Sequence, residues 1–440
     1  MSDKSACHLG QAIAKGEVTP SQLTEEMLNR AQGHPLVDRI FARLCQERAM
    51  AEAQAADHRA RAGTRRHILD GVPLSWKDLF DVAGYGTEAG SKLLQGRVPE
   101  HDAIVVARTA QLGAVALGKT HMSELAFSGL GLNPMTATSP CVNDPEAVSG
   151  GSSSGAAASV AFGLAPAAVG SDTGGSIRVP SAWNDLVGFK PTHDLLPLSG
   201  VVPLAPKFDT VGPICHTVED VMALFSMLQG ETSVQQPQSC GALRLAVLSC
   251  SEIAECDAAP QAAFGHACTQ IRAAGHYIEH VEDERVSQML GLSAVLYTSE
   301  AYGLWRDAIE AAPDAMYPPI LERFRQGAQF DAPAYVSAWR QLEQLRTQIW
   351  QDLRGYDAVL LPTVPILPPK QRRLEEESAY YVRANLMTLR NTRVGNLLGA
   401  CAITLPSATP SCGVMALAPP HHDRALLNIA AAIEAPCRQG

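Results

Sequence analysis

Ser149-Gly-Gly-Ser-Ser-Ser-Gly155 and Gly170-Ser-Asp-Thr-Gly-Gly-Ser176-Ile-Arg-Val-Pro180 are two clusters of Gly and Ser. The segment between them, Ala156–Val169, is short and apolar, so we expect a buried connector that brings both clusters to one point. Consecutive backbone N–H groups in Gly-rich turns form concavities for negative charge. An enzyme that cleaves a carbonyl compound needs such a concavity, because the oxygen becomes charged at the tetrahedral stage. Ser176 directly follows two glycines, which places its hydroxyl beside those donors.

The composition is typical of a large protein with an extensive interior. The chain has 440 residues, 46% hydrophobic and 18% charged, which allows one big domain or two. Its net charge of −10 argues against nucleic acid and against an anionic membrane as partners. The first residues, Met1–Cys7, lack the pattern of an export signal, and no run of about 18 apolar residues occurs, so we expect a cytoplasmic protein. The 11 cysteines include no C-x-x-C pair, which fits reduced thiols.

The first half of the chain shows apolar periodicities that alternate between helix and strand. We expect a helix beginning near Pro20–Ser21, a helix at Ala42–Arg61, a short strand carrying Lys77, a helix at Asp102–Leu112, a strand at Ala114–Gly118, a helix at Ala156–Phe162, a strand at Ala167–Val169 and a helix from His216 to Leu228. Residues 181–213 are interpreted as irregular. The alternation favours an α/β arrangement around a sheet.

The second half begins after Gly230–Gly241, a polar stretch that is the best candidate for a boundary. Beyond it we expect strands at Leu243–Leu248 and Ala358–Pro362 and helices at Ala259–Ala274, Gln288–Tyr302, Tyr335–Leu353, Glu375–Leu398 and Ala425–Glu434. This half holds fewer chemical motifs than the first.

Three motifs together resemble the amidase-signature family. They are Gly71-Val-Pro-Leu-Ser-Trp-Lys77-Asp78, the cluster Ser149–Gly155, and Asp172-Thr-Gly-Gly-Ser176-Ile-Arg178-Val-Pro180, in the family's order and spacing. Weaker likeness extends through Asp209–Pro213 and returns at Ile403–Pro406. One such cluster would be modest evidence, whereas three in register are highly specific.

The resemblance implies one amidase domain over residues 1–440 with an α/β fold, in which helices cover both faces of a large mixed β-sheet. Residues 65–230 would form the catalytic signature core, and residues 242–355 a more variable helical region on the substrate side. The resemblance also implies amide hydrolysis without a metal or a cofactor.

A Ser-Ser-Lys triad is implied by the same resemblance. Ser176 matches the nucleophile, Ser152 the proton relay that follows a cis peptide bond, and Lys77 the base. Backbone donors for the oxyanion match the residues just before the nucleophile: Thr173, Gly174 and Gly175.

Lys77 can act as a base only when its amine is neutral. From a reference pKa near 10.4, the neutral fraction at pH 7 is below about one in a thousand, so burial must lower the pKa by roughly three units. The apolar neighbours of Lys77 in the sequence supply such surroundings. Taken alone, Lys77 would instead be interpreted as a surface ion pair with Asp78 or Asp81. The two serine clusters favour the catalytic interpretation.

Four further residues are predicted to line the substrate pocket. Ser128, Gly129 and Met135 belong to a loop punctuated by Gly and Pro, and Arg393 belongs to an otherwise apolar helix. An exposed helical face is the usual explanation for such an arginine. The alternative hypothesis is that it selects a substrate with a carboxylate or another polar end.

Two functions fit these motifs. The first is a free-standing hydrolase that cleaves the C–N bond of a small linear amide to a carboxylate and ammonia or an amine. The second is the A-type glutaminase component of a tRNA-dependent amidotransferase. We favour the first, because nothing in the second half indicates a docking surface. The expected partners are a small-molecule amide and, if the chain self-associates, a second copy of itself in a homodimer.

Overall fold

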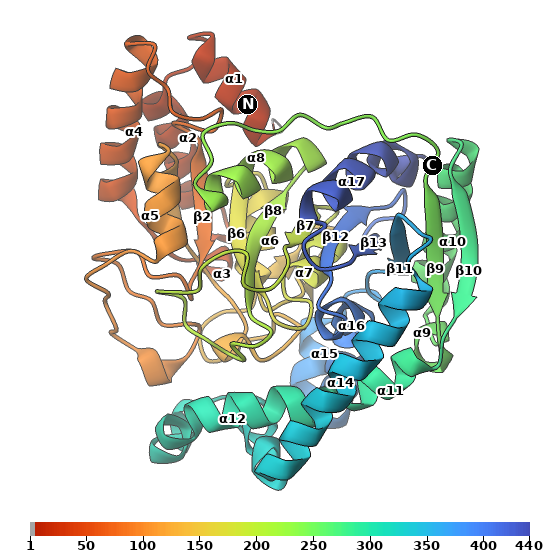
Figure 1. Ribbon diagram of the computed structural model, residues 1–440. Coiled ribbons are helices and arrows are strands. Elements are labelled where there is room, and N and C mark those ends of the chain that lie inside the picture. The colour runs from red at the N-terminus through yellow and green to blue at the C-terminus, as the bar shows by residue number, and fades with distance from the viewer. Residues whose placement is uncertain (1–4) are drawn as a thin grey trace.

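One mixed sheet of 11 strands forms the centre of the computed structural model, which describes residues 5–440 (Figure 1). Its strands are β1 (Phe41–Leu44), β2 (Pro73–Lys77), β3 (Val115–Thr120), β6 (Ala167–Asp172), β7 (Val187–Lys190), β8 (Thr210–Cys215), β9 (Arg244–Ser249), β10 (Tyr277–Glu282), β11 (Ala358–Pro362), β12 (Cys401–Pro406) and β13 (Gly413–Ala418). They are ordered β1-β3-β2-β6-β8-β7-β12-β13-β11-β9-β10. Strand β2 is parallel to both β3 and β6, and β9 is parallel to both β10 and β11, while the other neighbours are antiparallel. Strands β4 (Pro140–Cys141) and β5 (Asp144–Val148) form a separate pair.

Helices cover both faces of the sheet. They are α1 (Ala6–Ala14), α2 (Pro20–Gly33), α3 (Val37–Ile40), α4 (Gln46–Arg61), α5 (Ile104–Gln111), α6 (Ser154–Ala161), α7 (Arg178–Trp183), α8 (Val218–Gln229), α9 (Ser251–Ala254), α10 (Ala258–Ala273), α11 (Arg285–Gly291), α12 (Ser293–Ala311), α13 (Pro318–Arg325), α14 (Ala332–Asp352), α15 (Gln371–Glu376), α16 (Ser378–Leu397) and α17 (Asp423–Arg438).

Strand β7 shows the two faces most simply, because successive residues of a strand point to opposite sides. A Cβ on Gly188 would lie 2.7 Å from Cβ of Ser181 in α7. The ring of the next residue, Phe189, packs at 5.1 Å on Phe225 in α8. The sheet is therefore covered by α7 on one side and by α8 on the other, and the predicted fold class is confirmed.

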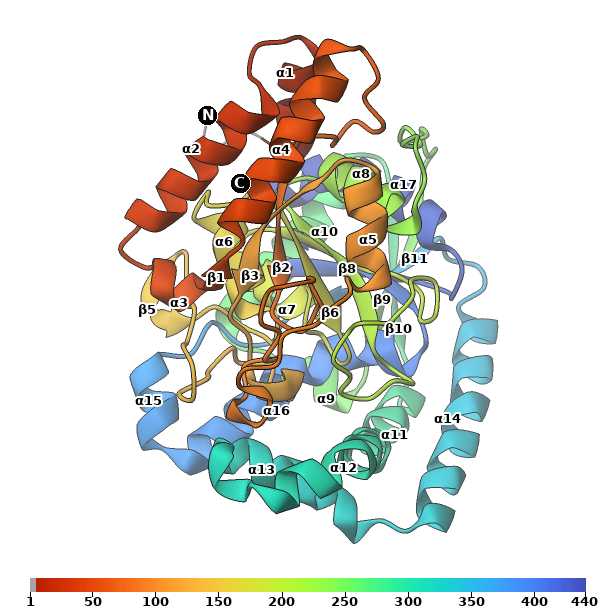
Figure 2. The same cartoon turned by 90° about the vertical axis from the view of Figure 1, so that its left-hand side faces the viewer.

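Helices α12, α13 and α14 lie together beyond the sheet (Figures 1 and 2). Phe208 anchors them to the core, since its ring lies 4.3 Å from that of Tyr297 in α12 and 5.1 Å from that of Trp339 in α14. Trp305 of α12 adds a hydrogen bond of 3.0 Å to the carbonyl oxygen of Pro203. These contacts hold the three helices against the loop that precedes β8.

Several predicted elements have the wrong type or extent. The first residues of the predicted helix Ala42–Arg61 form the edge strand β1, and only Gln46–Arg61 is helical. Residues 181–213 are not irregular throughout, because they contain the end of α7, all of β7 and the start of β8. The predicted helices Gln288–Tyr302 and Glu375–Leu398 both extend across a break between two helices. At the second break Glu377 is extended, with φ −117° and ψ 89°, and no Gly or Pro marks it in the sequence.

The polar stretch Gly230–Gly241 is a connection between two parts of the same sheet. Gly230 ends α8 in the left-handed conformation, with φ +83°. The chain beyond the stretch supplies β9 to β13, and β12 pairs with β7 from the first half. Within residues 5–440, no helix combines the length and the apolar character needed to cross a bilayer.

Candidate active site

Lys77 is the last residue of β2, at the edge of the sheet where the parallel strand β6 also ends. The carboxyl ends of parallel strands are the usual place for a site in such sheets. The Lys77 side chain is fully buried, and its Nζ donates hydrogen bonds to Ser152 Oγ at 2.7 Å and to Ser171 Oγ at 2.8 Å. The lysine therefore joins two strands to the first Gly/Ser cluster.

The pKa of Lys77 is lowered to about 7 by burial, although the negative charges of Asp172 and Asp209 act to raise it. An amine with this pKa is partly neutral at neutral pH and can accept a proton. The direction and size of this change agree with the expectation from the sequence.

The surface ion pair that would otherwise explain Lys77 does not form. Asp78 lies 3.1 Å from Lys119, and Asp81 lies 2.6 Å from Arg97. Both carboxylates therefore have other partners.

The two Gly/Ser clusters meet as the sequence predicts. The Ser153 N–H donates to the carbonyl oxygen of Ser176 at 3.2 Å, and the Ser153 hydroxyl donates to the carbonyl oxygen of Ser171 at 3.2 Å. The peptide bond between Gly151 and Ser152 is cis. These contacts place Ser152, which bonds Lys77, in the segment packed against Ser176.

Asp172 and Arg178 fix the turn that carries Ser176. Arg178 donates to both carboxylate oxygens of Asp172, from Nε at 3.0 Å and from Nη2 at 2.8 Å, and both side chains are fully buried. Burial alone would raise the pKa of Asp172, but the charge of Arg178 holds it at about 2. The structural role that the sequence suggests for both residues is therefore confirmed.

The turn between Asp172 and Ser176 presents backbone groups beside the serine. The Gly175 N–H donates to Asp172 Oδ1 at 2.8 Å, so this amide already has an acceptor. Gly175 has φ +134°, a conformation that favours glycine. The Thr392 hydroxyl donates to the carbonyl oxygen of Gly174 at 2.7 Å and holds the turn from α16.

A small cavity lies next to Ser176. Its lining comprises Ala126, Phe127, Ser128, Thr173, Gly174, Ser176, Leu204, Tyr297, Arg323, Leu389 and Arg393. The remaining space is about 20 Å³, room for about one water molecule, so a substrate enters only as lining side chains move apart.

Two of the four predicted pocket residues, Ser128 and Arg393, belong to this lining. The other two lie outside it. The carbonyl oxygen of Gly129 accepts the Gly151 N–H at 2.7 Å, which supports the first Gly/Ser cluster from behind. The Met135 N–H donates to Asn133 Oδ1 within its own loop, at 3.1 Å.

The sequence did not single out Ser171, Tyr297 or Arg323. Ser171 carries a usable signal, because it lies at the carboxyl end of a predicted strand next to the motif of Ser176. Tyr297 and Arg323 come from α12 and α13, where no motif marks them. Only the folded chain brings them to Ser176.

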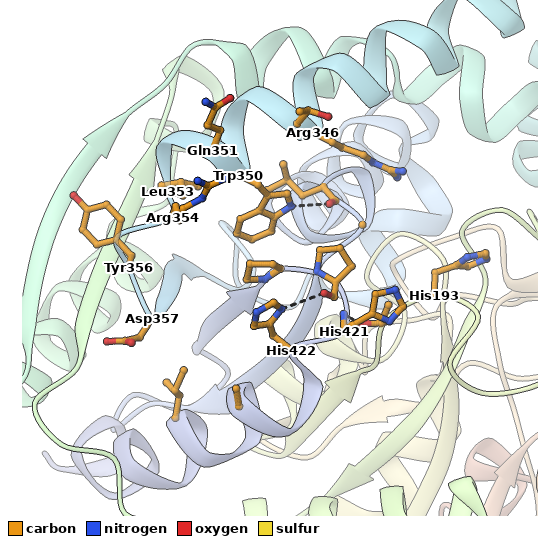
Figure 3. A pocket seen from close by; sticks show the side chains of 18 residues that line it. His193, Arg346, Trp350, Gln351, Leu353, Arg354, Tyr356, Asp357, His421 and His422 are labelled. Carbon is orange, nitrogen blue, oxygen red and sulfur yellow. Dashed lines mark hydrogen bonds between the residues drawn. The ribbon is translucent and has the colours of Figure 1, made fainter.

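A much larger cavity, of about 890 Å³, lies between the end of α14 and the turn that precedes α17 (Figure 3). Trp350, His421 and His422 are among its lining residues, and Lys77, Ser152 and Ser176 are not. Among residues 5–440, no group of three or more His, Cys, Asp or Glu side chains is placed to hold a metal.

Comparison with known proteins identifies the class. The family described as Amidase matches residues 22–427. A 2-amino-5-chloromuconic acid deaminase of Comamonas testosteroni is 31% identical over 408 residues, which cover 89% of this chain and 87% of that protein. A solved structure described as an amidase superposes with a TM-score of 0.86 at 30% identity, covering 99% of this chain and 100% of the other. This chain therefore belongs to the amidase-signature family, whose members hydrolyse C–N bonds.

The first half resembles a second group of relatives. The A-type component of the glutamyl-tRNA(Gln) amidotransferase of Anaeromyxobacter dehalogenans is 42% identical over 234 residues. That match covers 52% of this chain and 47% of the relative, so it spans about half the length of each.

Proposed function

We propose that this chain hydrolyses a small linear amide through an acyl-enzyme on Ser176, with Ser152 as the proton relay and Lys77 as the base. One observation carries the proposal: a buried amine with a pKa of about 7 lies 2.7 Å from the Ser152 hydroxyl, in the segment packed against Ser176. A serine hydroxyl is a poor nucleophile until a base takes its proton, and this arrangement supplies that base.

In the acylation step, Ser176 Oγ forms a bond to the amide carbonyl carbon. Its proton passes to Ser152 Oγ while the Ser152 proton passes to the neutral Nζ of Lys77. The carbonyl oxygen becomes negative and is stabilised by backbone N–H groups of the turn. We assign this role to Thr173 and Gly174, which line the cavity; Gly175 contributes only by sharing the N–H that it donates to Asp172.

Collapse of the tetrahedral intermediate breaks the C–N bond. Lys77 returns a proton through Ser152 to the leaving nitrogen, which departs as ammonia or an amine. Water then attacks the ester on Ser176, again with its proton passing to the lysine, and the carboxylate is released. The same three side chains thus serve both halves of the reaction.

Purified protein and a panel of simple amides test this function, with ammonia release as the readout. We expect turnover without any partner, and we expect Ser176→Ala to lower kcat by at least about 1000-fold. The control is Ser407→Ala, which removes an exposed hydroxyl that bonds only within its own turn. Unchanged activity of the Ser176→Ala variant would contradict the proposal.

The amidotransferase glutaminase is the second candidate, and the match of 42% identity to the A-type component of such an enzyme supports it. That match covers only about half of each chain, whereas the match to the deaminase covers 89% of this one. Glutamine hydrolysis that appears only when a partner protein is added would favour the second candidate. Hydrolysis of simple amides by the purified chain favours the first.

A further inference from the structure

Two arginines and one tyrosine form the part of the small cavity that faces Ser176 from the second half of the chain. Tyr297 comes from α12, Arg323 from α13 and Arg393 from α16. Three helices that are separate in the sequence therefore bring cationic and hydroxyl groups to the nucleophile.

Neither arginine has an acidic partner within residues 5–440. On the same helix as Arg393, Arg390 pairs with Glu255 at 3.2 Å, but the ion pairs of the described chain include neither Arg393 nor Arg323. Arg323 instead donates one N–H to the carbonyl oxygen of Phe127 at 2.9 Å and lies 4.4 Å above that ring. The cavity lining contains no Asp or Glu.

This pairing of like charges is unfavourable in the empty pocket. Burial and the charge of Arg393 lower the pKa of Arg323 to about 9, and burial lowers the pKa of Arg393 as well. An anion between the two guanidinium groups would relieve the repulsion.

Tyr297 provides an independent observation. Its side chain is 6% exposed, and its hydroxyl oxygen is buried with no hydrogen-bond partner in the described part of the chain. Buried polar groups without partners are uncommon in proteins, and such a group in a cavity is satisfied when a ligand supplies the acceptor.

The arginine pair lies close to the reacting carbonyl. A Cβ placed on Gly174 would be 3.7 Å from Arg393 Cγ and 4.0 Å from its Nε. The guanidinium group therefore begins next to the turn that holds the developing oxyanion. Because the cavity is also small, only a few atoms fit between the reacting carbonyl and a bound anion.

We propose that this pocket selects the monoamide of a short dicarboxylic acid, whose free carboxylate is bound by Arg323, Arg393 and Tyr297 while its amide carbonyl faces Ser176. The proposal rests on the amidase function proposed above and names its substrate class. It also discriminates against glutamine, because the α-ammonium group of glutamine would meet two cations and no carboxylate in this lining.

Three amides separate the contributions of carboxylate and ammonium: glutaramate, hexanamide and L-glutamine. Hexanamide replaces the carboxylate of glutaramate by an alkyl end, and glutamine adds only the α-ammonium group. From ammonia release we expect kcat/KM for glutaramate to exceed that for hexanamide by about 100-fold and that for glutamine by about 10-fold. A preference for hexanamide, or equal rates for glutamine and glutaramate, would overturn the proposal.

Variants locate the selectivity. Arg393→Met should lower the ratio of kcat/KM between glutaramate and hexanamide by about 10- to 100-fold. Arg306→Met is the matched control, because Arg306 lies on α12 with its side chain 63% exposed. The control should keep the ratio of the wild type, and an unchanged ratio in Arg393→Met would refute the assignment.

Binding without turnover separates this proposal from the proposed function. Calorimetry with glutarate and the Ser176→Ala variant should show binding that Tyr297→Phe weakens by about 5- to 10-fold. The Tyr297→Phe change removes one oxygen that has no partner in the described part of the protein, so the packing remains. Glutarate binding in a chain that hydrolyses no amide would sustain the anion site and remove the amidase function. Amide hydrolysis without glutarate binding would do the reverse.

Discussion

Lys77 and Lys119 are both buried lysines on neighbouring strands, but their partners differ. Lys119 lies 3.1 Å from the carboxylate of Asp78, whereas Lys77 bonds two hydroxyl groups, those of Ser152 and Ser171. A carboxylate at this distance stabilises the ammonium form, and a hydroxyl does so much less. Lys77 is thus the one of the two that is placed to lose its proton and act as a base.

The pair predicts opposite effects on stability. In Lys77→Met the cost of burying an amine without a carboxylate disappears, so we expect the free energy of unfolding to rise by about 1–4 kcal/mol at pH 7. In Lys119→Met the charge of Asp78 stays buried and unpaired, so we expect a loss of about 3–5 kcal/mol. Urea unfolding at constant pH measures both.

The gain from Lys77→Met depends on pH in a defined direction. The pKa of Lys77 falls from 10.5 to about 7 on folding, so the unfolded chain binds more protons between these values. The unfolding free energy contributed by Lys77 therefore rises as the pH goes from 7 to 10.5 and is constant below 7. The advantage of the variant should be full at pH 6 and smaller at pH 9. An advantage that grows with pH would contradict the assigned shift.

Ser171 offers a finer test at the same site. It accepts a hydrogen bond from Lys77 Nζ at 2.8 Å, and an acceptor favours the ammonium form. In Ser171→Ala the pKa of Lys77 should fall, so the rise of kcat/KM with pH should move to lower pH by less than about one unit. An alkaline shift of that rise would show that Ser171 does not act in this way.

Among the elements, α16 supports the site most directly. Thr392 bonds the carbonyl oxygen of Gly174, Arg393 enters the cavity, and Asn396 Nδ2 donates to Asp172 Oδ1 at 2.9 Å. One helix therefore holds the turn, lines the pocket and bonds the buried carboxylate. The position of the turn depends on where α16 packs.

We expect Thr392→Val to lower kcat by about 10-fold with a smaller change in KM, because the Gly174 carbonyl loses its donor and the turn loosens where the oxyanion forms. Steady-state kinetics on one amide measures the effect. Thr392→Ser should restore most of the activity, since it retains the hydroxyl. Thr347→Val on the exposed side of α14 is the control. Equal loss in the Ser and Val variants would refute a role for the hydroxyl.

At the scale of the whole molecule, the central sheet links both halves of the sequence. The connection after Gly230 leads into β9, yet β12 from the second half pairs with β7 from the first. Arg178 joins the halves again by donating to the carbonyl oxygen of Thr392 at 2.8 Å. Removing either half would leave an open sheet edge and an incomplete site.

A protease site inserted between residues 234 and 238 tests this link. We propose that residues 1–440 form one domain, so the cut chain should keep its two fragments together, retain activity and melt in one transition. Size-exclusion chromatography and calorimetry of the cut protein are the measurements. Two separate transitions, or fragments that part without denaturant, would show two independent domains.

The sequence predicts the chemistry of this protein better than its pocket. Lys77, Ser152 and Ser176 lie in motifs whose local composition marks them, and the helix capped by Thr19 is found where the capping pattern places it. Strand β7 was missed because four buried residues carry too little pattern to identify. Arg323 and Tyr297 were missed because their meeting with Ser176 depends on how α12 and α13 pack, which no local pattern encodes.

The central claim is that the neutral amine of Lys77 activates Ser176 through Ser152. The rate of labelling by a fluorophosphonate, followed by mass spectrometry of the modified peptide, tests it most directly. We predict a single adduct on Ser176 whose rate of formation rises with pH around the Lys77 pKa of about 7 and then levels off. A label on another residue, or a rate that stays flat from about pH 6 to pH 9, would contradict the account.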